Sequence, residues 1–372
     1  MTGKFLFTAL LALAWVSPAM AQAPAGQPSA IPDDGPYVFQ PTPHRYEAWW
    51  VCDGKVEREV QRKRRSDTTF APRCGYERPA VIPARIAAAP VRYDGGRIVA
   101  LSDIHGQYEL MLRLLRAHHV IDADGDWALG RDHLVITGDV FDRGDKVNEV
   151  FWLLFQLQRQ AHAAGGAVHF LLGNHETMVL YDDLRYIHPK YADVARLLGR
   201  PYSALYGADT VIGGWLRTRP VMLKLGDTLF LHGGIAPENL DLVTGIDGTN
   251  SGYRGSLGVS KDTVKSDPAT ARLYDGKRSP IWYRGYFNGE LDTPAVTGMV
   301  ERLGLARIVV GHTTMDEVAS FHAGRVIAID SGIKHGQSGQ LLFIENGQLS
   351  RGLLDGTREP LPERQVAPPD KD

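Results

Sequence analysis

Residues that can bind metal ions or transfer protons follow several short apolar runs in this sequence. The first run, Ile98–Leu101, is followed by Asp103 and His105. Four later runs also end on carboxylate, amide or imidazole side chains, at Asp139 and Asp142, Asn174 and His175, His232, and His312. Each residue alone would be typical of a turn or a helix cap. Because the pattern recurs, we predict one shared polar site, whose mixed oxygen and nitrogen donors suit Mn²⁺, Fe or Zn²⁺.

The apolar runs are expected to be strands, because they are continuous rather than alternating, as in strands buried on both faces. Parallel strands bring their carboxyl ends to the same edge of a sheet, where ligands bind in open α/β sheets. We therefore expect one site at one edge of one sheet. The segments Tyr108–His118 and Val147–Ala163 have apolar residues at helical spacing and are predicted to be the helices between these strands.

Three motifs carry a resemblance to a known family. The segments DIHGQ at Asp103–Gln107, GDVFDRG at Gly138–Gly144 and GNHE at Gly173–Glu176 resemble the calcineurin-like metallophosphoesterases, and within them the phosphoprotein phosphatases. The resemblance spans residues 97–333, and both order and spacing match. It implies an α/β fold of the calcineurin-like type, a β-sandwich of mixed sheets flanked by helices around a βαβαβ metal-site core.

The resemblance also implies two divalent metal ions, with Mn²⁺ expected before Fe or Zn²⁺. Asp139 would bridge the two metals, Asp103 and His105 would complete the first, and the second would be held by Asn174, His232 and His312. A hydroxide bound to both metals would then attack the phosphorus directly. No covalent phospho-enzyme is expected.

Four further residues are given roles by the same resemblance. His175 would protonate the leaving group as a general acid, and Asp142 would hold its ring in orientation. Arg143 and Arg284 would bind the phosphate oxygens of the substrate.

Two departures refine the family assignment. Many phosphodiesterase-type relatives end this region in GHxH, whereas Gly311–Thr314 reads GHTT here. The second departure is the DSG turn at Asp330–Gly332, where eukaryotic Ser/Thr phosphatases carry a different loop. The missing second histidine favours monoesters and pyrophosphates over nucleic-acid phosphodiesters. With an export signal, the chain is most similar to the bacterial, Shewanella-like phosphatases, in which activity on phosphotyrosine is known.

Composition and the first residues bear on location. The chain has 372 residues, 44% of them apolar and 23% charged, with a net charge of −2, so neither nucleic acid nor a membrane is expected as a partner. Residues 1–21 have the charged, apolar and small-x-small regions of a secretory signal peptide cleaved after Ala21. We therefore expect a periplasmic or secreted protein; the oligomeric state is not predicted.

The rest of the chain is divided by composition. We expect a flexible leader at 22–45, a disulfide-stapled extension at 46–90, the catalytic domain at 91–356 and a disordered tail at 357–372. In an exported protein Cys52 and Cys74 are expected to pair, with free thiols as the alternative. Thr177–Pro220 is predicted to be mostly helical, either as a cap beside the site or as a cover for the sheet, and Gly245–Gly258 to be a mobile loop.

Three functions remain open. The leading hypothesis is a metal-dependent phosphoprotein phosphatase acting on phosphotyrosine, phosphoserine or phosphothreonine, or on a small phosphomonoester. The alternative is a hydrolase of dinucleoside tetraphosphates, and the remote one a binding protein with an inactive catalytic fold. A substrate panel with added Mn²⁺ would separate them.

Overall fold

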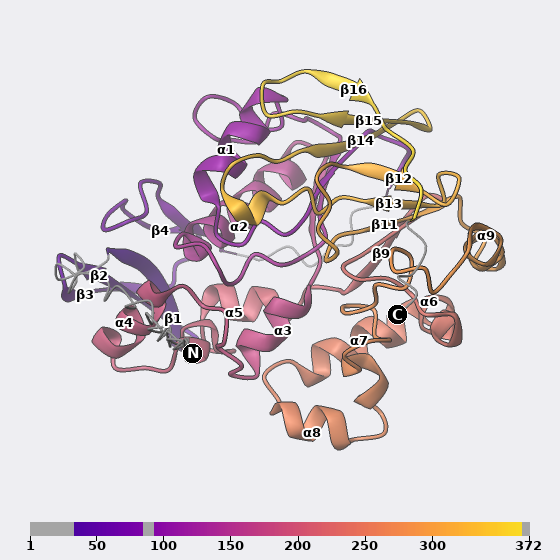
Figure 1. Ribbon diagram of the computed structural model, residues 1–372. Coiled ribbons are helices and arrows are strands. Elements are labelled where there is room, and N and C mark those ends of the chain that lie inside the picture. Colours follow the sequence, from indigo (N-terminus) through magenta and orange to yellow (C-terminus); the bar gives the residue numbers. More distant parts are fainter. Residues whose placement is uncertain (1–32, 85–92, 367–372) are drawn as a thin grey trace, which may run out of the picture. The chain divides into compact units, whose positions relative to one another are not determined.

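The computed structural model describes residues 33–84 and 93–366 (Figure 1). The predicted signal peptide lies outside these residues. Within the described ranges, no helix is both long and apolar enough to cross a membrane.

Two mixed β-sheets form the centre of the fold (Figure 1). The six-stranded sheet has the order β16-β15-β14-β6-β7-β8, with bounds Arg358–Pro360, Gln348–Gly352, Leu341–Glu345, Ile98–Leu101, His133–Ile136 and Ala167–Phe170. The five-stranded sheet has the order β12-β13-β11-β10-β9, with bounds Ala319–Phe321, Val326–Ala328, Arg307–Val310, Thr228–Leu231 and Met222–Leu225. Strands β6, β7 and β8 are parallel, as are β10, β11 and β13. The predicted β-sandwich of mixed sheets is confirmed.

The strands are apolar throughout because both of their faces are buried. In β6, Ile98 and Ala100 pack in a cluster with Phe230 and Val309 of the other sheet. The intervening residues Val99 and Leu101 belong instead to the larger core that the helices share. A strand with a sheet on one side and helices on the other has no face for water, so its sequence does not alternate.

Helices cover the outer faces of the sheets. The bounds of the α-helices are α1 Tyr108–Ala117, α2 Val147–Ala163, α3 Asn174–Leu180, α4 Pro189–Leu198, α5 Val211–Leu216, α6 Leu240–Thr244, α7 Ile246–Ser256, α8 Lys261–Ser266 and α9 Thr293–Arg302. Short 3₁₀ turns lie at η1 Tyr202–Tyr206, η2 Pro237–Asn239, η3 Ala271–Tyr274 and η4 Ile333–His335. Both predicted helices before β8 are confirmed, and α2 packs against β8.

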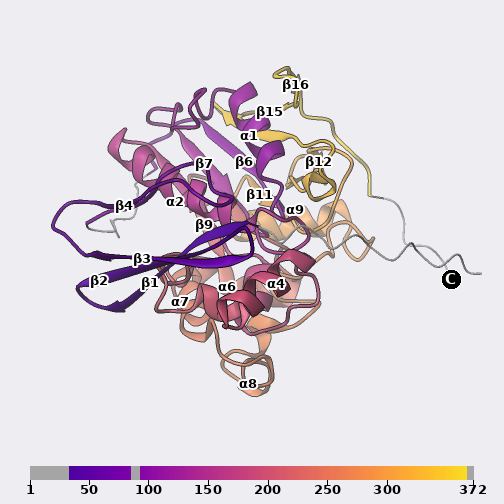
Figure 2. The same cartoon turned by 90° about the vertical axis from the view of Figure 1, so that its left-hand side faces the viewer.

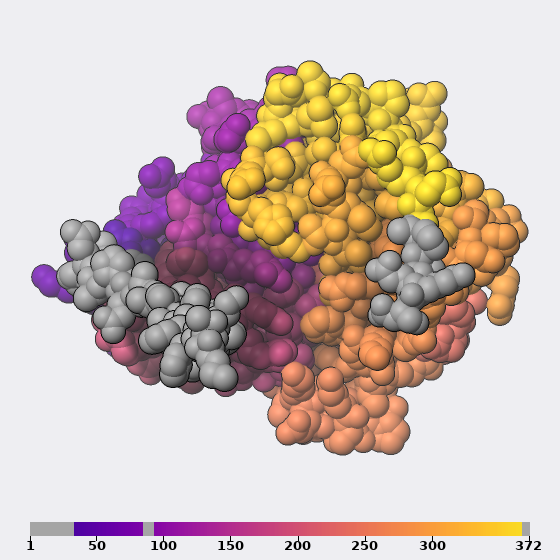
Figure 3. Space-filling view, viewed as in Figure 1, coloured from indigo at the N-terminus to yellow at the C-terminus, as the bar shows by residue number. Residues whose placement is uncertain are grey.

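On the face seen in Figure 3, C-terminal residues in yellow and orange lie beside residues of the magenta middle of the chain.

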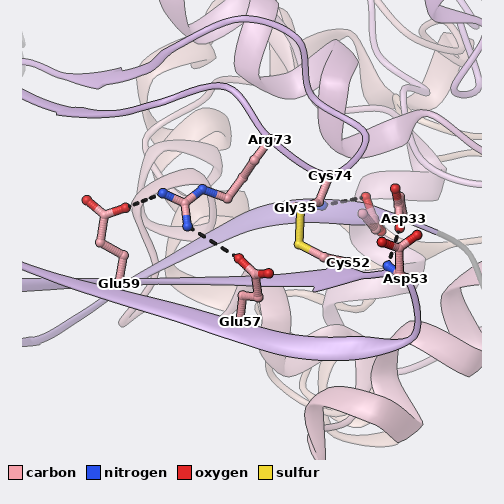
Figure 4. Close-up of a disulfide and its surroundings, with 9 residues drawn as sticks. Asp33, Gly35, Cys52, Asp53, Glu57, Glu59, Arg73 and Cys74 are labelled. Carbon is pink, nitrogen blue, oxygen red and sulfur yellow. Dashed lines mark hydrogen bonds and ion pairs between the residues drawn. A yellow bond between two sulfur atoms is a disulfide. The ribbon is translucent and has the colours of Figure 1, made fainter.

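An N-terminal extension of three antiparallel strands lies beside α4 (Figure 2). Its strands are β1 Asp34–Thr42, β2 Arg45–Cys52 and β3 Lys55–Arg62, followed by the hairpin of β4 Thr68–Phe70 and β5 Ala80–Ile82. The predicted disulfide between Cys52 and Cys74 is confirmed (Figure 4). It joins the end of β2 to the loop between β4 and β5.

The extension is also linked to α2 and to the loop that precedes it. Lys190 of α4 connects the extension to this loop. Its Nζ lies 3.5 Å from Oδ1 of Asp34 in β1 and donates a hydrogen bond to the carbonyl oxygen of Asp145, before α2, at 2.7 Å. The Trp152 indole in α2 donates to the carbonyl oxygen of Pro36 at 2.9 Å. The extension therefore supports the segment that carries Asp142 and Arg143.

Three expectations drawn from composition were wrong. β1 lies inside the segment predicted to be a flexible leader, because its aromatic residues are buried against β2 and the helices despite the Gly and Pro around them. β16 lies inside the predicted disordered tail, where pairing with β15 orders it. The predicted loop Gly245–Gly258 is largely α7, which Asn250 anchors by accepting the N–H groups of Val221 and Met222 at 2.9 and 3.1 Å.

Candidate active site

One cavity gathers most of the predicted site residues. It is lined by Asp103, His105, Asp139, Arg143, Asn174, His175, Tyr186, Trp282, Arg284, His312 and Lys334. Asp142 and His232 are buried directly behind this lining. All ten predicted site residues are therefore brought together.

The expectation of a single sheet edge was wrong. Asp103, Asp139 and Asn174 follow strands of the six-stranded sheet, whereas His232 and His312 follow β10 and β11 of the other sheet. The sequence does not distinguish the sheets because both contain parallel apolar strands. The site lies where the carboxyl ends of the two sets of strands meet.

Asp139 occupies the centre of the cluster. Its Oδ2 lies 3.1 Å from His232 Nε2 and 3.8 Å from the Nε2 atoms of both His105 and His175. Its Oδ1 accepts the backbone N–H of His175 at 3.0 Å. Burial opposes ionisation, but the surrounding imidazoles, His232 foremost, hold the pKa of Asp139 well below its usual range. This carboxylate is therefore an anionic donor that faces both groups of ligands.

Asp103 connects the two sheets at the site. Its Oδ2 accepts hydrogen bonds from Ser102 Oγ at 2.6 Å and from the backbone N–H of His312 at 2.9 Å. Burial, reinforced by the charge of Asp330, raises the pKa of Asp103 to about 8. Without a nearby cation this carboxyl group is thus costly to ionise.

Two imidazoles are oriented by backbone carbonyl groups. His105 Nδ1 lies 2.7 Å from the oxygen of Phe141, and His232 Nδ1 lies 2.8 Å from the oxygen of Thr137. A carbonyl oxygen can only accept, so each ring has a proton on Nδ1, and Nε2 is then the ring nitrogen that can bind a metal. His232 Nε2 also lies 2.9 Å from Oδ1 of Asn174, so the donor atoms of these two side chains are adjacent. Both Nε2 atoms face Asp139, as metal-ligating nitrogens would.

The donor set fits divalent metal ions. Donor atoms of Asp139, His232 and His312 lie within 4.8 Å of one another, and so do those of His105, Asp139 and His175, although His175 is set apart by its bond to Asp142. The buried Nε2 of His312 has no hydrogen-bond partner among the described residues. Burial also lowers the pKa of His312 well below its usual range, which keeps the ring neutral and able to bind a metal. Two donor groups that share one carboxylate suit a pair of cations.

His175 is distinguished from the other imidazoles by its partner. Its Nδ1 is hydrogen bonded to Oδ2 of the buried Asp142, while its Nε2 faces the cavity. Burial disfavours the charged ring, but Asp139 and Asp142 together raise the pKa of His175. A protonated imidazole that is oriented by a carboxylate can donate a proton to a leaving group.

The backbone is strained where these side chains enter the site. Asp103, His105, Asp139, Asp142, Arg143 and His312 all have positive φ, between 46° and 73°. Left-handed conformations cost non-glycine residues about 1–3 kcal/mol each and cluster at functional sites. A close approach explains one glycine of the GDVFDRG motif, because a Cβ on Gly144 would collide with the carbonyl oxygen of His105.

Three cationic side chains line the cavity. Arg284 Nη2 donates to the carbonyl oxygen of His312 at 3.4 Å, and the backbone N–H of Arg143 donates to the oxygen of Tyr186 at 2.9 Å. Lys334, which the sequence reasoning missed, lies 3.6 Å from Asp330 Oδ2. These cations give the cavity the charge that a phosphate group requires.

Glu176 and Tyr186 were not assigned roles from the sequence. The Glu176 carboxylate accepts the backbone N–H groups of Gly173, Asp139 and Val140 at 2.7–2.8 Å. A glutamate at the third position of a helix, as in GNHE, is the signal that could have indicated this. Tyr186 comes from the predicted cap segment, in which Tyr191, Tyr202 and Tyr206 are buried in the core and Tyr181 is partly buried.

The comparisons with known proteins agree with this geometry. Residues 96–315 match the calcineurin-like phosphoesterase family. A solved cold-active protein-tyrosine phosphatase from a psychrophilic Shewanella species is 42% identical, with 88% of this chain and 99% of that chain covered and a TM-score of 0.82.

Two sequence relatives are Shewanella-like protein phosphatases. Phosphatase 1 of Plasmodium berghei is 31% identical, with 69% of this chain and 72% of the relative covered. Phosphatase 2 of Arabidopsis thaliana is 26% identical, with 71% and 78% covered. The chain belongs to the calcineurin-like phosphoesterases and is a metal-dependent hydrolase of the phosphoprotein phosphatase kind.

Proposed function

We propose that this protein is an exported protein-tyrosine phosphatase that uses two divalent metal ions. The observation that carries the proposal is the His175–Asp142 pair. Nε2 of His175 lies 3.8 Å from the shared carboxylate Asp139, in a cavity that Arg143, Arg284 and Lys334 also line. The 42% identity to a solved protein-tyrosine phosphatase supports phosphotyrosine as the substrate.

The metal ions would be held in two groups that share Asp139. Asp103 and His105 would bind one, and Asn174, His232 and His312 the other. We propose Mn²⁺, with Fe or Zn²⁺ as alternatives, because the donors combine carboxylate, amide and imidazole. When bound, such a pair activates water and withdraws charge from the phosphoryl group.

The chain's own residues would bind the substrate and move one proton. Arg143 and Arg284 would bind the phosphate oxygens, since a guanidinium can donate two parallel hydrogen bonds to them. His175 would give the proton on Nε2 to the leaving oxygen, while Asp142 holds Nδ1 and keeps the ring in orientation.

The proposed location follows from two features. The sequence predicts a signal peptide at residues 1–21, and the Cys52–Cys74 disulfide is typical of oxidising compartments outside the cytosol. We therefore propose a periplasmic or secreted enzyme.

A substrate panel tests the proposal. Phosphate release would be measured with Mn²⁺ from a phosphotyrosine peptide, the same peptide bearing phosphoserine, and a dinucleoside tetraphosphate. We expect the largest kcat/KM on phosphotyrosine. Fastest turnover of the dinucleotide would reject the proposal, and the Asp139→Asn variant controls for contaminating phosphatases.

A further inference from the structure

Tyr186 is a large aromatic side chain at the rim of the cavity. It lies in the loop between α3 and α4, lines the cavity and is 43% exposed. Its ring centroid lies 5.5 Å from that of His175, with the planes inclined by 51°. Tyr186 is thus an exposed aromatic surface beside the proposed proton donor.

The position of the leaving group follows from His175. Because Nδ1 of His175 is bonded to Asp142, only Nε2 can give a proton to the departing oxygen. The leaving group must then lie next to the His175 ring, with the phosphate toward Arg143 and Asp139. The Tyr186 ring borders this same place, since Arg143 Cζ also lies 5.5 Å from its centroid.

The other large aromatic in the cavity lining lies elsewhere. The ring of Trp282 packs edge-on against His312, with 5.4 Å between the centroids. His312 belongs to the group of donors around His232, whose ring is 4.9 Å away. Among the residues of this lining, Tyr186 is therefore the aromatic side chain placed to contact the leaving group.

We propose that Tyr186 determines specificity for aromatic leaving groups by packing against the ring of the substrate tyrosine. This inference rests on the proposed function and names the residue that would select phosphotyrosine over phosphoserine. Paired aromatic rings attract each other beyond the area they bury, whereas a serine leaving group offers no ring. Ring packing by Tyr186 should therefore favour phosphotyrosine substrates and leave phosphoserine substrates unaffected.

Tyr186 contacts Arg143 both through its backbone and through its ring, and substitution of the side chain removes only the ring contact. Tyr186 accepts the backbone N–H of Arg143 through its own carbonyl oxygen, at 2.9 Å, and that bond does not depend on the ring. A displaced Arg143 would weaken phosphate binding on every substrate, whereas a lost ring contact would affect phosphotyrosine alone, so comparing two substrates separates the two effects.

The test compares kcat/KM on two peptides that differ only in phosphotyrosine or phosphoserine. Tyr186→Ala and Tyr186→Leu should lose about two- to tenfold on phosphotyrosine, as expected for one aromatic pair. Both should stay within about twofold of the wild type on phosphoserine. Tyr186→Phe keeps the ring and should retain the wild-type ratio, as should Val60→Ala on the distant strand β3. Metal content should be unchanged in all four variants.

Two outcomes would reject the role of Tyr186 alone: an equal loss on both peptides, or no loss on phosphotyrosine in the alanine and leucine variants. A wild-type enzyme that releases no phosphate from the phosphotyrosine peptide would reject the proposed function as well.

Discussion

The carboxylate of Glu176 accepts the backbone N–H of Asp139 at 2.8 Å, so a buried acid in α3 fixes the turn that presents the central ligand. Its two oxygens also accept the N–H groups of Gly173 and Val140. An amide has only one acceptor oxygen and would leave N–H groups unpaired in the core.

We therefore predict that Glu176→Gln lowers metal affinity by about 10- to 100-fold, as for other residues that orient metal ligands. Unfolding free energy should fall by about 1–3 kcal/mol. Metal titration and urea unfolding measure the two effects. The exposed Glu77→Gln is the matched control, and unchanged metal affinity in Glu176→Gln would contradict the role of this carboxylate.

Substitution of Asp139 should cost more than substitution of Asp103. Asp139 lies near both His105 and His232, one from each group of donors. Asp103 lies near the His105 imidazole and accepts the backbone N–H of His312. We expect Asp139→Asn to lose both metals and Asp103→Asn to lose one, measured as metal per chain after purification. Two retained metals and near-normal turnover in Asp139→Asn would show that this residue does not bridge.

The role of His175 can be separated from metal binding by the choice of leaving group. Without an acid, an alkoxide departs poorly, whereas an activated aryl oxide leaves unaided. His175→Asn should lose about 10²–10⁴-fold on phosphoserine peptides, much less on an activated aryl phosphate, and an intermediate amount on phosphotyrosine. Equal losses on all three, or a missing metal, would refute the assignment of His175 and Asp142.

The disulfide is expected to stabilise the fold by constraining the unfolded chain. Cys52 and Cys74 are separated by 22 residues, and closing a loop of this size is worth about 3 kcal/mol. The Cys52→Ser/Cys74→Ser double variant should lose about that amount in urea unfolding. Wild-type protein treated with reductant should match it, and a double variant as stable as the oxidised protein would contradict the expectation.

Glu149 gives the stability a dependence on pH. Asp34 and Glu149 share one largely buried lysine, Lys190, which lies 3.5 Å from the first and 3.9 Å from the second. Burial, reinforced by Asp34, raises the pKa of Glu149 to about 8, from 4.5 in an unfolded chain. The native state thus binds the Glu149 proton more tightly than the unfolded chain does. The stabilisation that this proton gives is complete below about pH 4.5 and is lost as the pH rises to about 8.

Glu149→Gln should remove this dependence because the amide stays neutral. Its stability relative to the wild type should increase from pH 5 to pH 9, by an amount of the order of a few kcal/mol. Urea unfolding across this range is the measurement. A difference that is constant, or that shrinks as the pH rises, would show that Glu149 is ionised in the native state.

The sequence by itself determined the local features of the site. The runs ending in Asp103, Asp139 and Asn174 identified strands, because a continuous apolar run followed by a polar turn needs only local information. The motifs DIHGQ, GDVFDRG and GNHE contain most of the residues that the cavity brings together, and the residue types at the ends of later apolar runs supplied His232 and His312. The two cysteines could be paired because they allow only one bridge within the chain.

Tertiary structure decided what depends on contacts between distant segments. His232 and His312 follow strands of a second sheet, and nothing in their apolar runs says which sheet a strand joins. β1 is rich in Gly and Pro and α7 in Gly and Ser, as loops are, yet burial of Phe39 and the hydrogen bonds of Asn250 order them. Tyr186 lies beside His175 because the loop between α3 and α4 borders the cavity. This contact depends on tertiary packing, so the spacing of residues along the sequence does not predict it.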